Sequence, residues 1–290
     1  MKLLGKPVAQ LIENQDILPI SGQKHCHLAI VLVGQNPQSA IYVREKVKAG
    51  RKLGLKISVY KFLNDTDLVK IQETIRYLNE DDDIAGIILQ LPLPNDLKSE
   101  TDQLISLIYQ SKDVDSLTEE NRQFAKKIKS LNNQKFSDKF SLLKKLYQLK
   151  KILIPPTAAA VMEILSYYKI ELNEIVLIGR GLLVGSPVAK LLDQMAIPYQ
   201  VIHSQTNEAE KKQLLKEASV IISGTSSALP IFSNKDIDKE AVIIDCAHDF
   251  DHNNSKDLKT QRVTPLIGGV GPVTVACLLR NVVLAKKWQE

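Results

Sequence analysis

The sequence of 290 residues lacks the features of membrane proteins and of exported proteins. No apolar run approaches the ~20 residues that a membrane-spanning helix needs. The N-terminus has no long apolar core followed by a small-residue cleavage site, so we expect no export. The three cysteines, Cys26, Cys246 and Cys277, lie far apart without metal-ligand spacing, which favours buried thiols in a reducing compartment. These absences predict a cytoplasmic protein with no membrane partner.

Motifs of two large enzyme classes are also missing. There is no G-x-S-x-G nucleophile elbow and no Walker lysine motif, which argues against a serine hydrolase or a P-loop enzyme. The formal net charge of +5 is mild and does not by itself indicate nucleic-acid binding. Four residues with ligating side chains, Asp245, His248, Asp249 and His252, have the spacing of one helical face. Their neighbours favour a loop instead, so we expect no bound metal.

Short, nearly continuous apolar runs alternate with helical stretches along most of the chain. Such runs are typical of parallel strands that helices cover on both faces, so the pattern predicts an α/β fold with two domains. The predicted strands are 28–33, 57–62, 84–91, 175–178, 199–202, 220–223 and 241–245. The predicted helices are 68–78, 101–109, 157–168, 186–196, 208–218 and 273–287, together with one that follows Asn36-Pro37.

A lysine-rich connector over 121–150 is predicted to separate a domain over 1–120 from one over 151–271. Residues 119–151 show no strand pattern, and after the opening glutamates they hold nine lysines against one acid, Asp138. We favour a solvated helical connector, because no pattern of stacking aromatic residues is interleaved. A nucleic-acid arm is the alternative. The lysines are Lys126, Lys127, Lys129, Lys135, Lys139, Lys144, Lys145, Lys150 and Lys151.

Tyr42 and Lys46 follow a helix-start signal, Asn36-Pro37, without a helix breaker between them. Asn is a good N-cap, and Pro fits the first helical position. Residues four apart lie on one face of a helix, so the phenol and the ammonium are expected to point the same way. A lysine whose charge is tuned by burial and neighbours can act as a general acid or base. A solvated surface pair is the alternative interpretation.

The strand predicted at 175–178 runs into a glycine-rich turn, Gly179-Arg180-Gly181, and a third glycine, Gly185, opens the next helix. A strand–turn–helix unit presents backbone N–H groups and a positive helix end to phosphate. The spacing is G-x-G-x-x-x-G rather than G-x-G-x-x-G, and a tight turn without a ligand would also use glycines. On spacing alone, both a nucleotide site and a ligand-free turn stay open.

The segment after the next strand bears on which nucleotide would bind. An NAD site normally offers a carboxylate there for the ribose 2′-hydroxyl, and this chain has none. Arg180, Ser204 and Thr206 instead offer a cation and hydroxyl groups that suit a 2′-phosphate, so NADP is favoured over NAD. Ser204 and Thr206 could alternatively cap the following helix. His203 is expected to make a loop hydrogen bond rather than to catalyse.

Several segments, in this order, resemble the bifunctional methylenetetrahydrofolate dehydrogenase/methenyltetrahydrofolate cyclohydrolase family, and together they cover nearly the whole chain. The Q-L-P-L-P and G-G-V-G-P segments are highly specific in combination. The matching segments are Tyr42-Val43 with Lys46 and Lys48-Ala49, Gly86 to Pro94, Lys112-Asp113-Val114-Asp115, Pro156-Thr157, Ile178-Gly179-Arg180 with Val184 to Pro187, His203-Ser204 with Thr206, and Thr264-Pro265 with Gly268 to Thr274.

The resemblance implies a role for each matching residue. Lys46 would be the central catalytic lysine, Tyr42 would pack along the folate, Gln90 would hydrogen-bond Lys46, and Asp115 would bind the pterin ring. Further substrate contacts would come from Leu91, Pro92, Gly268, Gly269, Pro272 and Thr274, and NADP contacts from Gly179, Arg180, Gly181, Val184, Ser204, Thr225 and His248.

The resemblance also implies an architecture. An N-terminal α/β folate-binding domain would be completed by a C-terminal helix at 272–290. A Rossmann-like, doubly wound domain would bind NADP, and the active site would lie in the cleft between the domains. On the same ground we expect a homodimer and tetrahydrofolate substrates, including those with polyglutamate tails. We expect no nucleic-acid partner.

The chain departs from the family pattern mainly in the cofactor half. Ser116 follows Asp115 where the family usually has glycine, Gly181 replaces a usual serine, and Ile267 replaces a usual proline. Further departures are Asn121-Arg122-Gln123, Ala158-Ala159-Ala160, the segment from Ser223 to Ser227, and Asp245-Cys246-Ala247-His248-Asp249. Two rival functions therefore stay open: a cyclohydrolase-only enzyme with an impaired cofactor site, and an RNA-binding protein that uses the lysine-rich connector.

Overall fold

A computed structural model of the chain describes residues 2–123, 152–225, 227, 229–253 and 262–289. The predicted connector over 121–150 lies almost entirely outside the described residues. The chain divides into two compact units. The three-stranded unit comprises Leu11–Phe124, Tyr147–Pro156 and Val275–Glu290, and the five-stranded unit comprises Met1–Gln10, Ala125–Leu146 and Thr157–Thr274.

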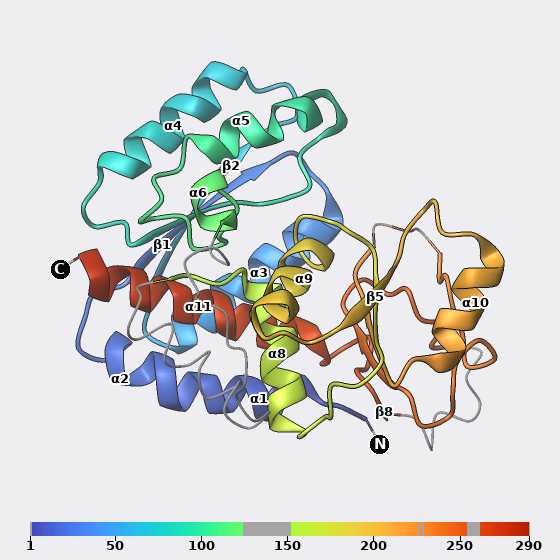
Figure 1. The fold of residues 1–290 in the computed structure, drawn as a ribbon. Coiled ribbons are helices and arrows are strands. Elements are labelled where there is room, and N and C mark those ends of the chain that lie inside the picture. The colour runs from blue at the N-terminus through green and yellow to red at the C-terminus, as the bar shows by residue number, and fades with distance from the viewer. Residues whose placement is uncertain (1, 124–151, 226, 228, 254–261, 290) are drawn as a thin grey trace. The chain divides into compact units, whose positions relative to one another are not determined.

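The three-stranded unit is built on a parallel sheet of order β2-β1-β3, with β1 His27–Val33, β2 Lys56–Phe62 and β3 Gly86–Leu89. All seven residues of β1 are buried, which is why this strand reads as an uninterrupted apolar run. In Figure 1, α4 (Leu68–Glu80) and α5 (Thr101–Ser106) lie on one side of this sheet, and α3 (Pro37–Lys52) lies on the other. The sheet is therefore covered on both faces.

The five-stranded unit holds a parallel sheet of order β5-β4-β6-β7-β8. The strands are β4 Ile175–Ile178, β5 Tyr199–Ile202, β6 Val220–Ser223, β7 Val242–Asp245 and β8 Arg262–Val263. In chain order this is the 2-1-3-4-5 arrangement of doubly wound folds, in which the chain reverses direction between the first and third strands. The predicted Rossmann-like architecture is thereby confirmed. The helices α8 Pro156–Tyr167, α9 Gly185–Gln194 and α10 Glu208–Glu217 follow the predicted pattern.

Several elements differ from the sequence prediction. The prediction omitted α1 Gly5–Ile12, the π-helical turn η1 Glu13–Ile17, α2 Leu18–Ser21, the 3₁₀ turn η2 Asn95–Glu100, α6 Glu119–Arg122 and β8. The strand expected over 84–91 is hydrogen-bonded as a strand only over Gly86–Leu89, and the helix expected over 101–109 ends at Ser106.

The C-terminal helix α11 starts earlier than predicted and spans Val270–Gln289. Pro272 therefore lies in its first turn rather than ahead of it. Proline fits there, because the first N–H groups of a helix have no intrahelical acceptor.

Lys112 fixes the end of α4 inside the three-stranded unit. Its buried ammonium donates to the carbonyl oxygens of Leu78, Asn79 and Asp81 at 3.2, 2.6 and 2.7 Å. These carbonyls close the last turn of the helix, where partners are otherwise missing and where a cation is favoured. Burial lowers the pKa of Lys112, and the nearby carboxylates of Asp82, Asp81 and Glu80 oppose this shift. The lysine of the Lys112-to-Asp115 segment is thus a structural cap.

Candidate active site

Lys46 and Gln90 meet at the carboxyl end of the three-stranded sheet. The Lys46 ammonium donates to Oε1 of Gln90 at 3.0 Å. Lys46 lies on α3, which follows β1, and Gln90 directly follows β3, so the pair sits where the chain changes direction between these neighbouring strands. Open α/β sheets bind ligands at this kind of position. The predicted hydrogen bond between the two side chains is confirmed.

The local sequence explains why α3 presents Lys46 there. The Asn36 side chain caps the helix by accepting from the backbone N–H groups of Gln38 and Ser39 at 2.9 and 3.1 Å. Pro37 is the first helical residue, as the sequence predicted. Lys46 is half-buried, whereas Tyr42, one turn earlier, leaves 52% of its surface exposed. The Tyr42 ring is thus available to stack against a ligand.

Gln90 is oriented by its own backbone surroundings. Its N–H donates to the carbonyl of Val31 at 2.9 Å, which extends the pairing of β3 with β1 by one residue. Its side-chain Nε2 donates to the carbonyl of Leu91 at 2.6 Å. Because the amide nitrogen donates to the Leu91 carbonyl, the amide oxygen faces Lys46 as an acceptor. Gln90 is 7% exposed, so this acceptor lies in a largely desolvated place.

Asp115 lies within electrostatic range of Lys46. Burial raises the pKa of its carboxyl, the Lys46 cation opposes that rise, and the Asp113 carboxylate adds to it. The backbone of the preceding segment runs beside β3, where Ile87 donates its N–H to the Lys112 carbonyl at 2.7 Å and pairs with Asp113. The structure therefore brings three of the predicted catalytic side chains, Lys46, Gln90 and Asp115, to one region of one unit.

The turn after Asp115 is organised by the buried carboxylate of Asp113. It accepts from the backbone N–H groups of Leu117 and Thr118 at 3.1 and 2.8 Å, and from the Thr118 hydroxyl at 2.7 Å. The Asn121 side chain adds a fourth bond at 3.0 Å. Sequence reasoning assigned no role to Asp113. The only signal for it was its place inside the matching segment.

Ser116 occupies a conformation that favours glycine. Its φ is +57°, its side chain is fully buried, and its hydroxyl has no hydrogen-bond partner within the described residues. The family usually has glycine here, and the left-handed φ supplies the physical reason. The substitution places strain and an unpaired hydroxyl directly beside Asp115.

The glycine turn after β4 forms a close-packed cradle in the five-stranded unit. Gly179 has a φ of +97°, and a Cβ at Gly185 would lie 2.1 Å from the Gly179 carbonyl oxygen. A Cβ at Gly224, which follows β6, would lie 2.3 Å from a methyl group of Val184. Only glycine therefore allows the turn, the start of α9 and the end of β6 to approach this closely. The cradle lies at the carboxyl ends of β4 and β6, where the chain of this sheet changes direction and doubly wound folds bind nucleotides.

The polar residues predicted to select NADP lie in or beside this turn. Arg180 and Ser204 are both exposed, and they follow β4 and β5, two hydrogen-bonded neighbours in the sheet. The Thr206 hydroxyl accepts from the His203 N–H at 3.0 Å, and His203 Nδ1 accepts from the Gln205 N–H at 3.2 Å. The predicted loop bond of His203 is confirmed. The N-cap of α10 is Asn207, so neither Ser204 nor Thr206 caps that helix.

Thr225 and His248 lie in loops that buried carboxylates organise. The Thr225 N–H donates to the fully buried Asp249 at 3.0 Å, and its hydroxyl donates to the same carboxylate. Asp245 accepts from the backbone N–H groups of Asp249 and Phe250 at 3.0 and 3.3 Å and pairs with His252 at 3.0 Å. Burial alone would raise the pKa of Asp245, but these hydrogen bonds and one from Ser223 lower it.

His248 is exposed with a φ of +65°, beside this carboxylate network. Its neighbours Asp245, Asp249 and His252 have the structural partners given above. Within the residues that the structure describes, no three His, Cys, Asp or Glu side chains are arranged to hold a metal ion.

The segment that holds the predicted substrate contacts Gly268 and Gly269 is packed against the first residues of the chain. Gly5 donates its N–H to the Gly268 carbonyl at 2.8 Å, and a Cβ on Gly5 would lie 1.8 Å from the Gly269 carbonyl oxygen. Gly268 has a φ of +82°, with open space where a side chain would be. Pro272 and Thr274 belong to the first turns of α11 rather than to a loop. Sequence reasoning missed Gly5, because nothing local shows that it packs against residues more than 260 positions away.

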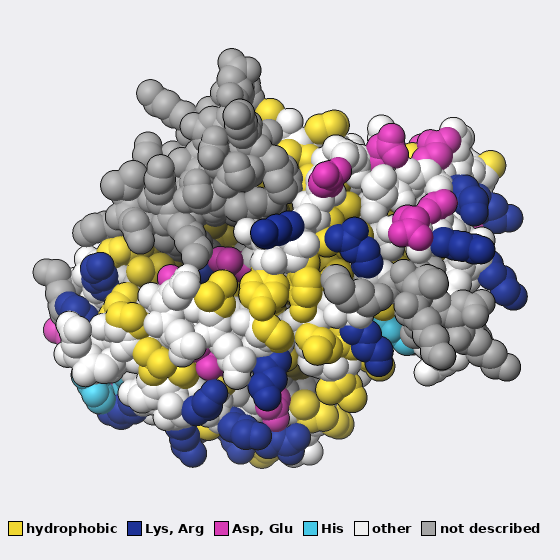
Figure 2. Space-filling view, turned by 90° about the horizontal axis from the view of Figure 1, so that it is seen from below, with side chains coloured by type: hydrophobic (Ala, Val, Ile, Leu, Met, Phe, Trp, Pro, Cys, Tyr) yellow, Lys and Arg dark blue, Asp and Glu magenta, His cyan; other side chains and the backbone are white. Residues whose placement is uncertain are grey.

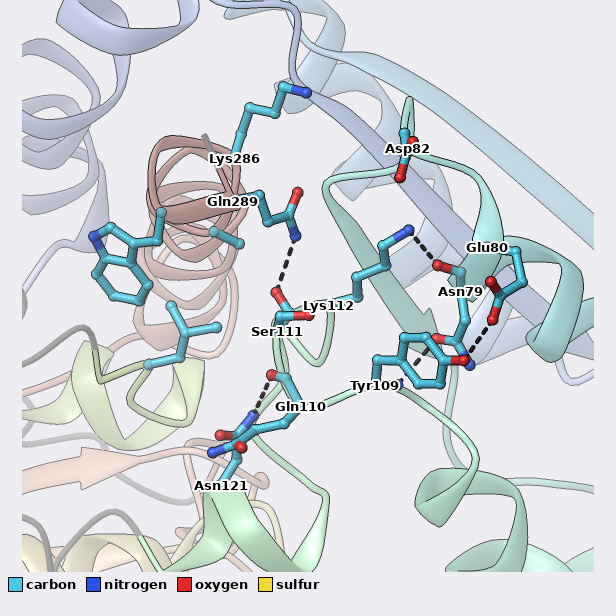
Figure 3. Close-up of a pocket in the computed structure, with 13 residues that line it drawn as sticks. Asn79, Glu80, Asp82, Tyr109, Gln110, Ser111, Lys112, Asn121, Lys286 and Gln289 are labelled. Atoms are coloured by element: carbon cyan, nitrogen blue, oxygen red, sulfur yellow. Dashed lines mark hydrogen bonds between the residues drawn. The ribbon is translucent and has the colours of Figure 1, made fainter.

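A separate pocket of the three-stranded unit is drawn in Figure 3, with a cavity volume of about 870 Å³. Its lining residues include Asn79, Tyr109, Lys112 and Gln289, and include none of Lys46, Gln90 and Asp115. Lys112 is committed to the end of α4, and Gln289 Nε2 donates to the Ser111 carbonyl at 3.1 Å. The side chains of Lys112 and Gln289 in this pocket thus stabilise the fold by donating hydrogen bonds to backbone carbonyls.

In the described part of the chain, no helix has the length and apolar character needed to cross a membrane.

The fold and the two sites define a class of protein. One parallel sheet carries a lysine, an amide and a carboxylate at its carboxyl end, and a second carries a glycine cradle suited to phosphate. This is the architecture of a two-domain α/β enzyme that uses a nucleotide. The chain belongs to the tetrahydrofolate dehydrogenase/cyclohydrolase family: residues 3–115 match the model of its catalytic domain, and residues 155–290 match the model of its NAD(P)-binding domain.

Individual relatives extend this match over most of the chain. The chain is 31% identical over 274 residues to the bifunctional protein FolD of Staphylococcus saprophyticus, covering 91% of this chain and 87% of the relative. It is 34% identical over 276 residues to the FolD of Chlamydia muridarum, covering 88% and 87%.

Solved structures agree in fold. The structure of a 5,10-methylenetetrahydrofolate dehydrogenase from the silkworm Bombyx mori superposes with a TM-score of 0.82 at 26% identity, covering 99% of this chain and 98% of that chain. The FolD structure from Campylobacter jejuni gives 0.81 at 26% identity, covering 100% and 99%. The predicted family and fold class are confirmed.

Proposed function

We propose that this chain oxidises 5,10-methylenetetrahydrofolate with NADP and hydrolyses the methenyl product to 10-formyltetrahydrofolate. The observation that carries the proposal is the grouping of Lys46, Gln90 and Asp115 at the carboxyl end of one parallel sheet, in a chain of the tetrahydrofolate dehydrogenase/cyclohydrolase family. Those three side chains offer a proton acceptor, a group that orients it, and a carboxyl that can hydrogen-bond a pterin ring.

Lys46 acts in the hydrolytic step. The oxygen of a water molecule bonds to the cationic methenyl carbon, and the amine form of Lys46 accepts a proton from that water. The bond from this carbon to N5 of the folate then breaks as the hydroxyl oxygen loses its remaining proton and forms the carbonyl of the formyl group, and N5 takes up a proton. Gln90 holds the Lys46 nitrogen in place through the 3.0 Å hydrogen bond. A positioned general base of this kind typically accelerates a reaction by about 10²–10⁴-fold.

Asp115 and Tyr42 bind the substrate in this proposal. The Asp115 carboxyl pairs with the pterin ring, and burial already favours its protonated form more than in a free aspartate. Tyr42 offers an exposed ring that can lie along the folate. Leu91, Pro92, Gly268, Gly269, Pro272 and Thr274 are proposed as further substrate contacts, on the strength of the family resemblance.

The cradle of the five-stranded unit suits the phosphates of NADP. The absence of side chains at Gly179, Gly185 and Gly224 lets the turn pack closely at the N-terminus of α9, where N–H groups and the helix dipole favour an anion. NADP supplies the acceptor for the hydride when it is bound. Gly181, Val184, Thr225 and His248 are proposed as further contacts, and Arg180 with Ser204 would bind the 2′-phosphate.

The finer features of the proposal rest on the resemblance. We propose a homodimer in the cytoplasm, with polyglutamylated substrates among those it accepts and with no nucleic-acid or membrane partner. Among the described residues on the face shown in Figure 2, lysine and arginine side chains lie beside acidic ones. Removal of the glutamate tail should raise the KM for the substrate at low salt if basic side chains attract it, and an unchanged KM would end that idea.

The test is an assay at two wavelengths that follows NADPH formation and methenyl decay separately. Lys46→Met should reduce hydrolysis by about 10²–10⁴-fold, because it removes the proton acceptor. The control is Lys52→Met on the same helix, where the ammonium of an exposed lysine pairs with Glu13 at 3.2 Å. Unaltered hydrolysis in the Lys46 variant would remove the basis for the assigned role.

Two measurements decide the rival functions, the same enzyme assay and an RNA-binding assay. No structural observation favours a cyclohydrolase-only enzyme, and reduction of NADP by 5,10-methylenetetrahydrofolate excludes it. The RNA-binding alternative concerns lysines that lie outside the described residues. It requires an RNA affinity that depends strongly on salt and that charge reversal across 126–151 abolishes.

A further inference from the structure

Asn281 is a fully buried amide in the interior of α11. Its Nδ2 donates to the carbonyl oxygens of Val114 and Ile154, both at 2.9 Å. These acceptors come from two segments of the three-stranded unit that are far apart in sequence. One segment leads into Asp115, and the other leads into α8. A single side chain thus fastens three parts of the chain together.

The orientation of this amide is fixed by its surroundings. Both N–H groups of Nδ2 face carbonyl oxygens, so the reverse orientation would place Oδ1 against two acceptors. Oδ1 itself is buried and has no partner within the described residues. A buried acceptor without a partner is unfavourable, whereas a leucine of similar size would carry no such cost. The two donated hydrogen bonds are therefore what this asparagine contributes.

The carbonyl of Val114 belongs to the peptide group that also contains the N–H of Asp115. Since a peptide group is planar, fixing its oxygen fixes the plane from which the Asp115 side chain projects. On the other side of Asp115, Ser116 is buried in the left-handed region and donates its N–H to the Asp113 carbonyl at 3.2 Å. The backbone of Asp115 is thus held on both sides, by α11 before it and by the Asp113 turn after it.

We propose that Asn281 is a positioning residue for the folate substrate and that it acts through Asp115. This inference rests on the proposed function, because it assumes that Asp115 binds the pterin. Asn281 sets the direction of the Asp115 carboxyl relative to Lys46 and Gln90 without touching the substrate. Small displacements of a positioned group weaken substrate binding and turnover out of proportion to the contact that is lost.

The test compares Asn281→Leu with a matched variant on the same helix. Gln289 also donates two side-chain hydrogen bonds to backbone carbonyls, those of Ala85 and Ser111, each at 3.1 Å (Figure 3 shows the bond to Ser111). Ser111 precedes Lys112, so the Gln289 bonds do not include the peptide group at Asp115. Gln289→Leu therefore removes the same number and kind of hydrogen bonds from the same helix but leaves the peptide group of Asp115 held.

The expected result is a selective loss at the folate side. Asn281→Leu should raise the KM for 5,10-methylenetetrahydrofolate at least tenfold and leave the KM for NADP within twofold. Gln289→Leu should leave both KM values within twofold. Combined with Asp115→Ala, the asparagine substitution should have little additional effect on the KM for folate, because two groups that act as one unit are not additive.

Distinct outcomes separate this inference from the proposed function. If the parent chain does not reduce NADP with 5,10-methylenetetrahydrofolate, the proposed function fails whatever the variants do. If the parent is active and Asn281→Leu loses stability in urea with an unchanged KM for folate, Asn281 is only structural and the inference is overturned. Should the leucine variant not fold, Asn281→Ser leaves room for a bridging water, and the same KM criterion applies to it.

Discussion

The Lys46 nitrogen lies 3.0 Å from Oε1 of Gln90, although 44 residues separate the two in sequence. The amide nitrogen of Gln90 is already bound to the Leu91 carbonyl at 2.6 Å, so only the oxygen can face the lysine. A neutral acceptor in this place orients the lysine nitrogen without adding a charge that would favour the ammonium form. The choice of glutamine rather than glutamate therefore bears directly on whether Lys46 can accept a proton.

Gln90→Glu tests this relationship. The variant places a carboxylate at the position of the amide, and a nearby anion favours the charged form of a lysine. We expect hydrolysis of the methenyl substrate at neutral pH to fall at least tenfold, and the pH dependence of hydrolysis to move to higher pH. The measurement is methenyl decay across pH, with Gln90→Asn as a neutral comparison. A reduced rate with an unmoved pH profile would show that Gln90 affects only geometry.

The parts of the fold that the sequence predicted are those in which one local pattern decides the structure. The runs at 175–178 and 220–223 are fully buried strands with the predicted bounds, because strands buried on both faces must be continuously apolar. The run at 199–202 is also a strand with the predicted bounds, but it lies at the edge of the sheet and exposes Gln200. The start of α3 followed from Asn36 and Pro37, whose capping and fixed φ act within a few residues. Family resemblance supplied Gln90 and Asp115, which no local pattern marks.

The missed features depend on contacts between distant segments. Gly5 supports Gly268 and Gly269, Lys112 caps a helix that ends more than 30 residues earlier, and Asn281 reaches Val114 and Ile154. Neither secondary-structure propensity nor hydrophobic periodicity predicts these contacts, because each one depends on where the tertiary fold places another segment. The earlier start of α11 was missed for a different reason: the glycine-rich segment before Val273 was read as a turn, whereas the helix already begins at Val270 and accepts Pro272 in its first turn.

Two glycines of the cofactor turn should respond differently to the same substitution. A Cβ at Gly185 would lie 2.1 Å from the Gly179 carbonyl oxygen, whereas at Gly181 the nearest atom would be 3.7 Å away. Gly185→Ala should therefore lower the free energy of unfolding by about 1–3 kcal/mol, the usual cost of overpacking. Gly181→Ala should leave it unchanged or raise it by about 0.4–1 kcal/mol, because alanine restricts the unfolded chain. Urea unfolding measures both, and equal losses would contradict the packing argument.

Ser116→Gly should stabilise the protein. A non-glycine residue in the left-handed region costs about 1–2 kcal/mol, and glycine at this φ of +57° removes that strain together with the unpaired buried hydroxyl. The greater freedom of glycine in the unfolded chain offsets part of the gain. We expect the free energy of unfolding to rise by about 1 kcal/mol in urea.

Lys169→Gly is the comparison for Ser116→Gly, because Lys169 is exposed at a φ of +51° and carries no buried hydroxyl. It should gain less than Ser116→Gly. A loss of stability in Ser116→Gly would mean that the serine hydroxyl contributes a stabilising contact.

Acid should weaken the three-stranded unit through Asp83, which joins the starts of its strands. Its carboxylate lies 2.9 Å from the Lys56 ammonium, 2.8 Å from His27 Nδ1 and 3.3 Å from His25 Nε2. The hydrogen bond from Lys56, followed by that from His27, lowers the pKa of Asp83 from 3.8 to about 2. A carboxyl with a lowered pKa in the folded state stabilises the fold above its unfolded pKa, and this contribution is lost as pH falls through the folded value.

The stability difference between the parent and Asp83→Asn should therefore be present at about pH 5 and should shrink as the pH falls from about 4 to 2. Because the Asp83 side chain is 41% exposed, solvent screening limits the whole effect to about 1 kcal/mol or less. Urea unfolding at a series of pH values measures it, and Asp65→Asn, at an exposed aspartate of the same unit, is the control. A difference that stays constant down to pH 2 would show that Asp83 contributes through hydrogen-bond geometry rather than charge. A difference that grows on acidification would contradict the assigned direction of the pKa shift, because the parent would then gain stability on protonation.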